Sequence, residues 1–304
     1  MLKYKQLPIY GQIIYITVCV YLLTQLWRLG CLLFVVSGFS WQAVLALPAN
    51  LNDFLLRPWS LVTYMFCHAD IDQNIFHILF NMLWLWWFGQ AYLRFHTSRQ
   101  LLSLYLAGGL FSGLFFLLAY NIFPYFIYER NVTCLVGASG ALMAVMGAVV
   151  MQPRQLVGVN LIFRIVNMQM RTLAIIIMVM TIFTGTAGNS GGLVCHIGGA
   201  LFGLIYGRFL QQGRDITAWV GRAIQAVGQW FSQLGKPRMK ASRGGRRDPI
   251  GADKMRDMNY NADRRQHEAQ IDAILDKISK HGYDGLSAEE KQMLFDASRR
   301  KANK

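Results

Sequence analysis

The amino-acid sequence predicts an all-α polytopic membrane protein, with six transmembrane helices followed by an α-helical C-terminal tail. Three observations lead to this prediction. Of the 304 residues, 54% are hydrophobic and 13% are aromatic. Only four acidic residues precede Leu210, whereas twelve acidic and nineteen basic residues follow it. All six long apolar runs also end by that point, so a membrane domain precedes a polar tail.

A helix needs about 20 residues to cross a bilayer, and the six apolar runs approach or exceed that length. They span residues 12–36, 74–93, 101–123, 139–151, 173–184 and 193–210. The run from Ser139 to Met151 is about 20 Å of helix, less than the hydrocarbon thickness of about 30 Å. We therefore expect Ser139 to lie below the membrane surface.

The distribution of basic residues predicts the orientation. In a six-span arrangement most cations fall on one side, and the opposite loops hold only Arg57 and Arg130. The positive-inside tendency then predicts that both termini are cytoplasmic. We expect the chain to lie in the inner or plasma membrane of the cell. No small-residue cleavage site follows the first run, so we expect that span to be retained. The net charge of +14 comes about equally from both halves, which favours attraction to anionic lipid over a nucleic-acid site.

We divide the chain into a membrane domain (1–211), a juxtamembrane amphipathic helix (212–235), a basic flexible linker (236–262) and a small helical hairpin (263–304). The juxtamembrane amphipathic helix is expected to lie on the cytoplasmic membrane surface, with docking onto a protein as the alternative. The linker is expected to be attracted to anionic lipid. The apolar positions of the amphipathic helix form one stripe, made of Ile216, Trp219, Val220, Ile224, Val227, Phe231 and Leu234.

The hairpin is expected to hold two short helices separated by Gly282 and Gly285. Ser287 and Glu290 have the spacing of a capping box at the start of the second helix. A hairpin of about 30 residues is too small to be very stable alone. We therefore expect it to dock on a cytoplasmic partner or to pair with a second copy in a dimer.

The stretch Gly137-Ala138-Ser139-Gly140 lies where a polar loop meets an apolar helix. A serine between glycines can act as a nucleophile, because the missing side chains let a carbonyl substrate approach its hydroxyl and the neighbouring N–H groups. Small residues also let transmembrane helices pack closely, so this stretch alone is equally consistent with a packing surface. A base and an anion-stabilising partner at the same depth would favour catalysis.

Polar residues inside membrane helices are costly, so each one needs a reason. His77 and Asn81 are four residues apart and share one helix face. They can line a site, or they can form an interhelical hydrogen-bond pair that only holds helices together. His196 opens the sixth run, with Gly199 and Gly203 on nearly the same face. That bare face lets another helix backbone approach the histidine.

Together these residues supply what acyl transfer requires. Ser139 offers the hydroxyl and His196 the base, while His77, Asn81 and the Ser139 backbone N–H are candidate oxyanion donors. The spans contain no suitably placed acidic residue to orient His196, which indicates a Ser-His dyad instead of a triad. The glycines Gly137, Gly140, Gly199 and Gly203 are expected to pack the helices. The five cysteines have no metal-ligand spacing, and we expect neither a metal nor another cofactor.

Three motifs resemble those of the rhomboid intramembrane serine proteases, with a bacterial-type six-helix core and a cytoplasmic C-terminal extension. They are His77-Ile-Leu-Phe-Asn81, Gly137-Ala-Ser139-Gly140 and His196-Ile-Gly-Gly199-Ala-Leu-Phe-Gly203, in the family's order. The resemblance covers roughly residues 9–210. It implies a Ser139–His196 dyad, an oxyanion hole formed by His77, Asn81 and backbone N–H, and cleavage of single-pass or polytopic membrane proteins within their transmembrane segments. It also implies that cleavage occurs near the outer membrane face without metal or ATP.

Two positions depart from the pattern of some rhomboids. Met143 stands where some members have a tyrosine that stacks on the histidine, so His196 must be oriented by other packing. Arg57-Pro58-Trp59 matches a loop that lies partly in the outer leaflet, but Ser60 follows where some members have arginine. Neither change removes a group that the reaction requires.

Two competing functions were weighed. A catalytically silent rhomboid-like chaperone or adaptor would bind transmembrane helices without cutting them, but it has no reason to keep both Ser139 and His196. A transporter or channel would be expected to have more charged residues in its spans and an internal repeat. The glycine-rich segment 184–192 is predicted to gate access to the site, with an ordinary connector as the alternative.

Overall fold

The computed structural model describes residues 4–35, 40–153, 158–161, 166–184, 189–234, 262, 266, 269–280 and 282–302. The chain forms two compact units, Met1–Lys236 and Pro237–Lys304, and each is described by itself. Residues 185–188 of the predicted gating loop lie outside the described part. So do residues 235–261, which make up nearly all of the predicted basic linker.

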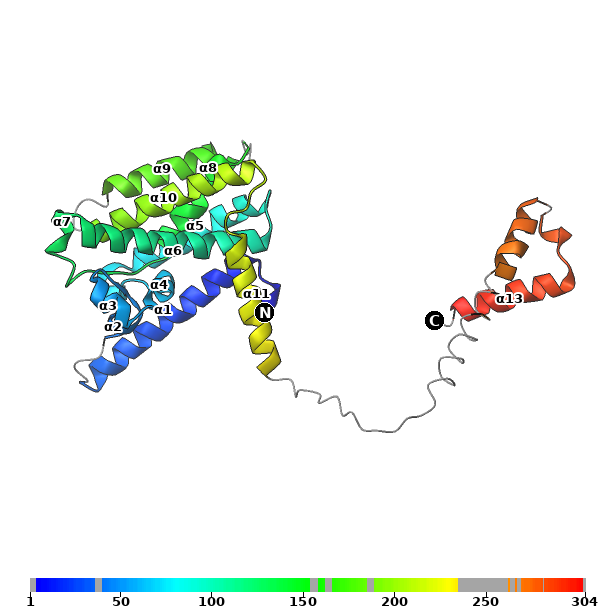
Figure 1. The fold of residues 1–304 in the computed structure, drawn as a ribbon, viewed down its shortest axis with the longest axis horizontal. Coiled ribbons are helices and arrows are strands. Elements are labelled where there is room, and N and C mark those ends of the chain that lie inside the picture. Colours follow the sequence, from blue (N-terminus) through cyan, green and yellow to red (C-terminus); the bar gives the residue numbers. More distant parts are fainter. Residues whose placement is uncertain are drawn as a thin grey trace. The chain divides into compact units, whose positions relative to one another are not determined.

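The first unit is a bundle of helices (Figure 1). Three of its helices, α1, α6 and α10, are long and apolar enough to cross a membrane, and α8 and α9 are shorter apolar helices. The predicted all-α membrane bundle is confirmed. Its main helices are α1 (Ile9–Leu33), α5 (Ile71–Leu93), α6 (Ser98–Ile122), α8 (Ser139–Met151), α9 (Met170–Thr184), α10 (Ser190–Gln211) and α11 (Ala218–Leu234).

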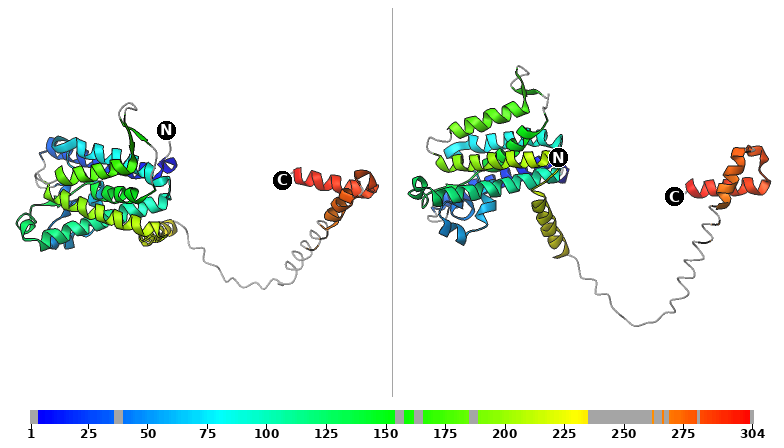
Figure 2. Two further views of the ribbon diagram at one scale, coloured as in Figure 1. Left: turned by 90° about the horizontal axis from the view of Figure 1, so that it is seen from above. Right: turned by 45° about the horizontal axis from the view of Figure 1, so that its top comes forward.

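Helix α8 is the centre of the bundle. Every residue from Gly140 to Val150 is buried, and α5, α6, α9 and α10 pack around it. Figure 2 shows α9 at one edge of this group. A short helix can be wholly apolar when all of its sides face other helices. Ser139 is therefore presented from the middle of the bundle and not from its surface.

The segment between α1 and α5 lies outside the predicted spans and folds into short elements. They are α2 (Gln42–Leu45), β1 (Leu47–Pro48), α3 (Leu51–Leu56), α4 (Ser60–Thr63) and the 3-10 turn η2 (Tyr64–Phe66). Strand β1 pairs antiparallel with β2 (Cys134–Leu135), which leads into the start of α8. This pairing ties the first loop to the segment that carries the candidate nucleophile.

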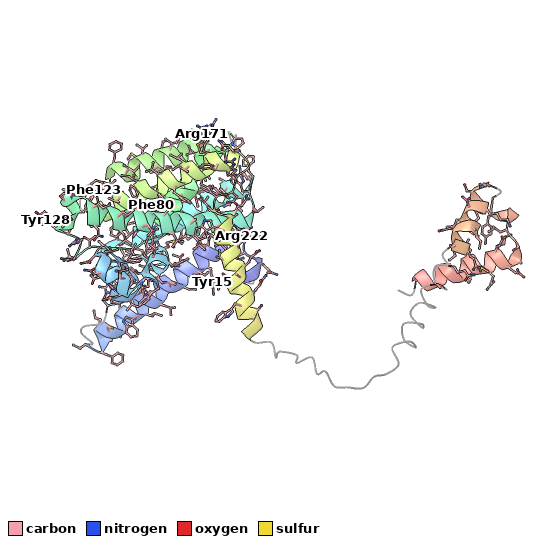
Figure 3. The ribbon with its side chains drawn as sticks, in the orientation of Figure 1. Tyr15, Phe80, Phe123, Tyr128, Arg171 and Arg222 are labelled. Carbon is pink, nitrogen blue, oxygen red and sulfur yellow. The ribbon has the colours of Figure 1, made fainter. Side chains whose placement is uncertain are left out.

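The remaining elements of this unit are short. The turn η1 (Tyr4–Gln6) precedes α1, and α7 (Pro124–Ile127) follows α6. Between α8 and α9, strands β3 (Gly158–Leu161) and β4 (Val166–Gln169) form an antiparallel pair. Figure 3 shows Phe123 and Tyr128 at the end of the bundle where α7 lies, and Arg171 and Arg222 toward the opposite end.

Helix α5 is kinked near its start. Asn74 has non-helical angles (φ −166°, ψ 87°), so residues 71–73 form a turn that is separate from the straight part of the helix. The sequence-based boundary at residue 74 coincides with this kink. The apolar run begins there because the preceding turn carries polar residues.

Helix α11 begins after a turn in which the backbone N–H and the hydroxyl of Thr217 donate to Asp215 Oδ1 at 2.9 and 2.8 Å. The predicted stripe lies on one face of this helix, since Val220 and Val227 are seven residues apart and point the same way. Val220 is buried, whereas Trp219 and Val227 are more than half exposed. The helix packs against α6, and part of its apolar face stays uncovered within the unit.

The second unit contains a helical stretch over 269–280, the turn η3 (Tyr283–Gly285) and α13 (Ala288–Ala302). The predicted capping box is present: Ser287 N–H donates to Glu290 Oε2 at 2.7 Å, and Glu290 N–H donates to Ser287 Oγ at 3.2 Å. Lys277 Nζ lies 2.9 Å from Glu290 Oε1 and joins the two helical stretches.

Candidate active site

The segment that leads into α8 holds Ser139 in place. Gly137 has a φ of +125°, a conformation that side chains disfavour, and its N–H donates to the Tyr64 carbonyl at 2.9 Å. Ala138 caps the helix and Ser139 is its first residue. Ser139 is partly exposed, while the residues on both sides of it are buried. Its hydroxyl is therefore accessible at the N-terminus of a helix, where backbone N–H groups are not used within the helix.

His196 lies beside this hydroxyl. Its Nε2 is 2.8 Å from Ser139 Oγ, although the two residues come from different helices and are 57 positions apart. The imidazole is 8% exposed. Among the described residues, no side chain or backbone atom forms a hydrogen bond with His196 Nδ1. The predicted pair is therefore brought together as a dyad in the described part of the chain.

Glycines set the distance between α8 and α10. A Cβ atom on Gly199 would collide with the Gly140 carbonyl oxygen, and one on Gly203 would collide with the backbone of Ala144. Gly140 itself lies against Cys195 and Ser112. These three predicted packing glycines therefore lie between helices, as expected. Because these faces carry no side chains, the backbones of the two helices can approach closely.

Gly137 differs from this expectation. It lies before α8 and does not separate two helices. A Cβ atom there would lie 2.9 Å from both Cε1 and Nε2 of His77, and 3.7 Å from Ser139 Oγ. The missing side chain lets the His77 ring approach the serine. His77 and Ser139 thus border the same small volume.

Asn81 is buried on the same helix, and its side chain makes one identified contact. Its Nδ2 lies 3.1 Å from Nε2 of His68. Because an amide group has two N–H donors, this contact leaves the second donor for another acceptor. The structure places Asn81 and His77 on one side of α5, as the four-residue spacing predicted.

His68 is a site residue that the sequence analysis missed. It is fully buried, and the Ala138 backbone N–H donates to its Nε2 at 3.5 Å. Its ring lies edge-on to His77, with the ring centroids 5.1 Å apart. The sequence analysis considered only polar residues within apolar runs, and His68 precedes its run by six positions. A histidine a short distance before a span that carries His77 was the available signal.

The first loop is fixed by polar contacts. Trp59 Nε1 donates to the Val44 carbonyl at 2.9 Å, and the Arg57 guanidinium donates to the Ala43 carbonyl. Ser60, which replaces the arginine of some relatives, is buried. Arg57 and Trp59 thus attach this segment to the backbone of α2.

Met143 is buried one turn along α8 from Ser139. Its Cβ would lie 2.9 Å from a Cβ on Gly199. Where some relatives place an aromatic ring near the histidine, this chain fills the α8–α10 interface with a thioether side chain.

The described residues contain no group of three or more His, Cys, Asp or Glu side chains that could hold a metal ion.

The chain is similar to known proteins in two regions. The family model for the rhomboid domain matches residues 56–213, and a model for a family of unknown function, DUF6576, matches residues 256–300. The chain is 29% identical over 181 residues to RHOMBOID-like protein 12, mitochondrial, of Arabidopsis thaliana, which is 54% of this chain and 52% of that protein.

Two further relatives match the chain. Rhomboid protease GlpG of Pectobacterium atrosepticum is 30% identical over 113 residues, covering 37% of this chain and 35% of that protein. Rhomboid protein 1, mitochondrial, of Saccharomyces cerevisiae is 27% identical over 194 residues, covering 59% and 49%. The chain thus spans about half or less of the length of these curated relatives. Because the rhomboid model matches more than half of the chain and spans the segments that carry both Ser139 and His196, the protein belongs to the rhomboid family.

Proposed function

We propose that the protein is an intramembrane serine endopeptidase that cleaves transmembrane segments of membrane proteins through a Ser139–His196 dyad. His196 Nε2 accepts the Ser139 hydroxyl proton as Oγ attacks the scissile carbonyl carbon. The resulting imidazolium then gives the proton to the leaving amine, and an acyl-enzyme remains. Water attacks that ester with His196 again as the base, which releases the acid product and restores the serine.

The oxyanion of each tetrahedral intermediate needs donors on the side of Ser139 opposite the base. The candidates are the Ser139 backbone N–H, the His77 ring and the free N–H of Asn81. His77 meets the geometric requirement best, because its ring lies against Gly137 and borders the volume next to Ser139 Oγ. The helix N-terminus adds a favourable field for negative charge.

One observation carries the proposal: the 2.8 Å contact between His196 Nε2 and Ser139 Oγ. A serine and a histidine that only held helices together would need no oxyanion donors beside them and no glycine at residue 137. Here the hydroxyl is partly exposed, its base is almost buried, and a second histidine faces the same volume. This combination is what acyl transfer requires.

The same proposal covers location and partners. We place the chain in a cell membrane with both termini in the cytoplasm, and we propose that anionic lipid attracts the basic tail. Two of the relatives are named as mitochondrial, which makes the membrane itself part of the proposal. We retain the division into the four parts 1–211, 212–235, 236–262 and 263–304, and the break between compact units after Lys236 supports the boundary nearest to it. A cytoplasmic partner, or dimer formation through the hairpin, is proposed for the last part.

The test is labelling of the full chain in proteoliposomes by a fluorophosphonate probe. Wild type is expected to be labelled, and Ser139→Ala and His196→Ala are expected to lose labelling. Ser112→Ala is the matched control, because Ser112 lies next to Gly140 but donates its hydroxyl to the Gly108 carbonyl at 2.7 Å. Labelling that survives Ser139→Ala, or folded wild type that never reacts, would favour the non-catalytic adaptor and refute the protease.

A further inference from the structure

A buried carboxylate joins three segments at the start of α5. Asp70 is 5% exposed and accepts hydrogen bonds from Trp41 Nε1 and Gln42 Nε2, both at 3.1 Å. Gln25 Nε2 of α1 donates to it at 3.2 Å, and Arg28 Nε lies 3.8 Å away. We call these five residues the Asp70 cluster. They connect α1, the segment around α2 and the N-cap of α5.

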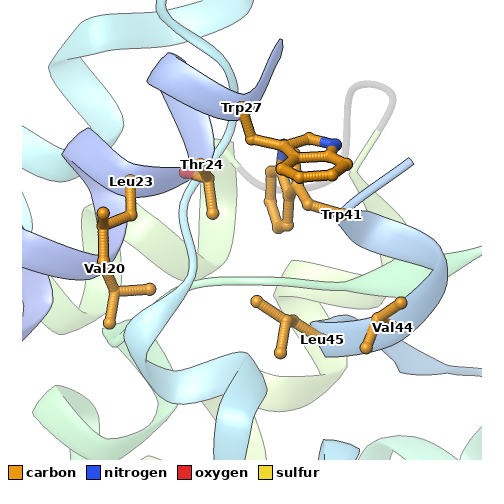
Figure 4. Close-up of a pocket in the computed structure, with 7 residues that line it drawn as sticks. All are labelled: Val20, Leu23, Thr24, Trp27, Trp41, Val44 and Leu45. Atoms are coloured by element: carbon orange, nitrogen blue, oxygen red, sulfur yellow. The ribbon is translucent and has the colours of Figure 1, made fainter. Parts of the chain in front are cut away.

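One member of the Asp70 cluster, Trp41, also lines an apolar groove. Figure 4 shows a groove between α1 and α2 in which the indole rings of Trp27 and Trp41 lie close together. The groove is lined by Val20, Leu23, Thr24, Trp27, Trp41, Val44 and Leu45. Trp41 therefore lines the groove and also donates to the carboxylate. Hydrogen bonds to a charged group are strengthened where water is scarce, so each donor contributes to fixing Asp70.

The turn after Asp70 is attached to α1 and not to the straight part of α5. The Ile71 N–H donates to Gln25 Oε1 at 3.2 Å. The non-helical conformation of Asn74 interrupts the helix before His77. A displacement of this turn is therefore not transmitted mainly along the helix. The shorter route to the site runs back along the chain to His68.

His68 lies two residues before Asp70 and contacts both sides of the candidate site. Its Nε2 accepts from Asn81 Nδ2 at 3.1 Å and from the Ala138 N–H at 3.5 Å. Its ring also contacts His77 at its edge. The position of residue 70 therefore affects the donor Asn81, the donor His77 and the segment that presents Ser139.

We propose that Asp70 is a positioning residue, which fixes His68 and through it the oxyanion donors of the dyad. This inference rests on the proposed protease function for its kinetic consequence. Asp70 touches neither the reacting atoms nor the dyad. Its role is to hold the polypeptide between η2 and α5 against α1 and α2, so that Asn81 and His77 stay aimed at the volume beside Ser139.

The chain offers a matched control two residues away. Asp72 also carries a carboxylate near Arg28, with contacts of 2.6 and 2.5 Å, but its side chain is 56% exposed. Exposed ion pairs contribute little. Asp70→Asn and Asp72→Asn make the same chemical change, and only the first places an amide N–H₂ group against the buried donors of the Asp70 cluster.

The experiment uses the full chain in proteoliposomes and a fluorophosphonate, with the maximal labelling rate and the half-saturating concentration measured separately. We expect Asp70→Asn to lower the maximal rate about tenfold or more, since small misplacements of reacting groups have large kinetic effects, and to change half-saturation by less than about twofold. Asp72→Asn is expected to behave as wild type. Equal losses in both variants, or a wild-type rate for Asp70→Asn, would overturn the proposal.

A second readout does not depend on catalysis. In protein labelled with ¹⁵N-histidine, the ring signals of His68 should shift in Asp70→Asn and stay in place in Asp72→Asn. This readout remains informative if wild type fails to react and the protease function is wrong. If Asp70→Asn does not fold, Trp41→Phe removes one donor and keeps an aromatic ring. Unchanged His68 signals in the folded variant would then count against positioning by Asp70.

Discussion

Substitution of Gly199 by alanine tests whether glycine contacts between α8 and α10 set the dyad distance. Gly199 lies one turn after His196, and its Cα faces the backbone of Gly140, the residue after Ser139. The added Cβ would overlap the Gly140 carbonyl oxygen and would lie 2.9 Å from Met143 Cβ and Ser112 Oγ. A carbonyl in a helix cannot rotate away, so the helices themselves must move apart.

The size of the effect follows from the contact distances. Carbon atoms pack at about 3.5–4.0 Å, so contacts near 2.9 Å require a separation of about 1 Å. A dyad contact of 2.8 Å that lengthens by this amount no longer forms a hydrogen bond. We expect a fall of about 100-fold in labelling rate, which corresponds to about 2.7 kcal/mol. Overpacking should also lower the free energy of unfolding by about 1–3 kcal/mol.

The assay is the rate of fluorophosphonate labelling of the full chain in proteoliposomes, together with its thermal midpoint. Gly30→Ala is the control, because Gly30 also lies in a spanning helix but has no atom within 4 Å of its added Cβ. That variant should label as wild type. If Gly199→Ala labels at the wild-type rate, the glycine interface does not set the dyad distance and our reasoning fails.

Two further predictions concern Gly137 and the C-terminal unit. Gly137→Ala should reduce the labelling rate about tenfold or more, because the φ of +125° is strained for alanine and the added Cβ would lie 2.9 Å from His77. The control is Gly213→Ala, where φ is +77° and the added Cβ meets open space, and it should label as wild type. The hydrogen bond from the Ser287 N–H lowers the pKa of the Glu290 carboxyl below its usual range. The ionised carboxylate therefore stabilises the folded unit above about pH 4.3, and this stabilisation is lost as the pH falls through the lower pKa of the folded state. The hydrogen-exchange protection factor of the first turn of α13, which is the intrinsic rate divided by the observed rate, should therefore fall at acid pH. Glu290→Gln should remove this fall, and a variant whose protection factor keeps the same pH dependence would contradict the assignment.

The helical spacing of polar residues predicted much of the candidate site. A four-residue interval places His77 and Asn81 on one face of α5. Intervals of three and seven residues place Gly199 and Gly203 on nearly the same face of α10 as His196. These relations are local to one helix, so the sequence contains them directly. Pairing of Ser139 with His196 was inferred from chemical need, since no local rule states which helices are neighbours.

The contacts between elements could not be predicted in the same way. His68 acts through Asn81 and Ala138, which are thirteen and seventy residues away along the chain. The pairing of β1 with β2 involves two residues on each strand, too few to produce an alternating pattern. The spacing of α11 correctly places its apolar residues on one face, but it does not show that α6 covers Val220 while Trp219 stays exposed. Periodicity identifies an apolar face without identifying what covers it.

A dyad places a particular demand on this fold. In a triad, a carboxylate orients the histidine and fixes its tautomer. Here the described residues offer His196 Nδ1 no hydrogen-bond partner, so the ring must be oriented by its bond to Ser139 and by the packing of α10. That packing is close, because Gly203 faces the backbone of Ala144 and Gly199 faces the Gly140 carbonyl oxygen together with Met143 and Ser112. The oxyanion side instead depends on His68 and side-chain hydrogen bonds. Changes at the glycines should therefore alter the distance between nucleophile and base, whereas changes near Asp70 should act through His68 on the proposed oxyanion donors and on the segment before Ser139.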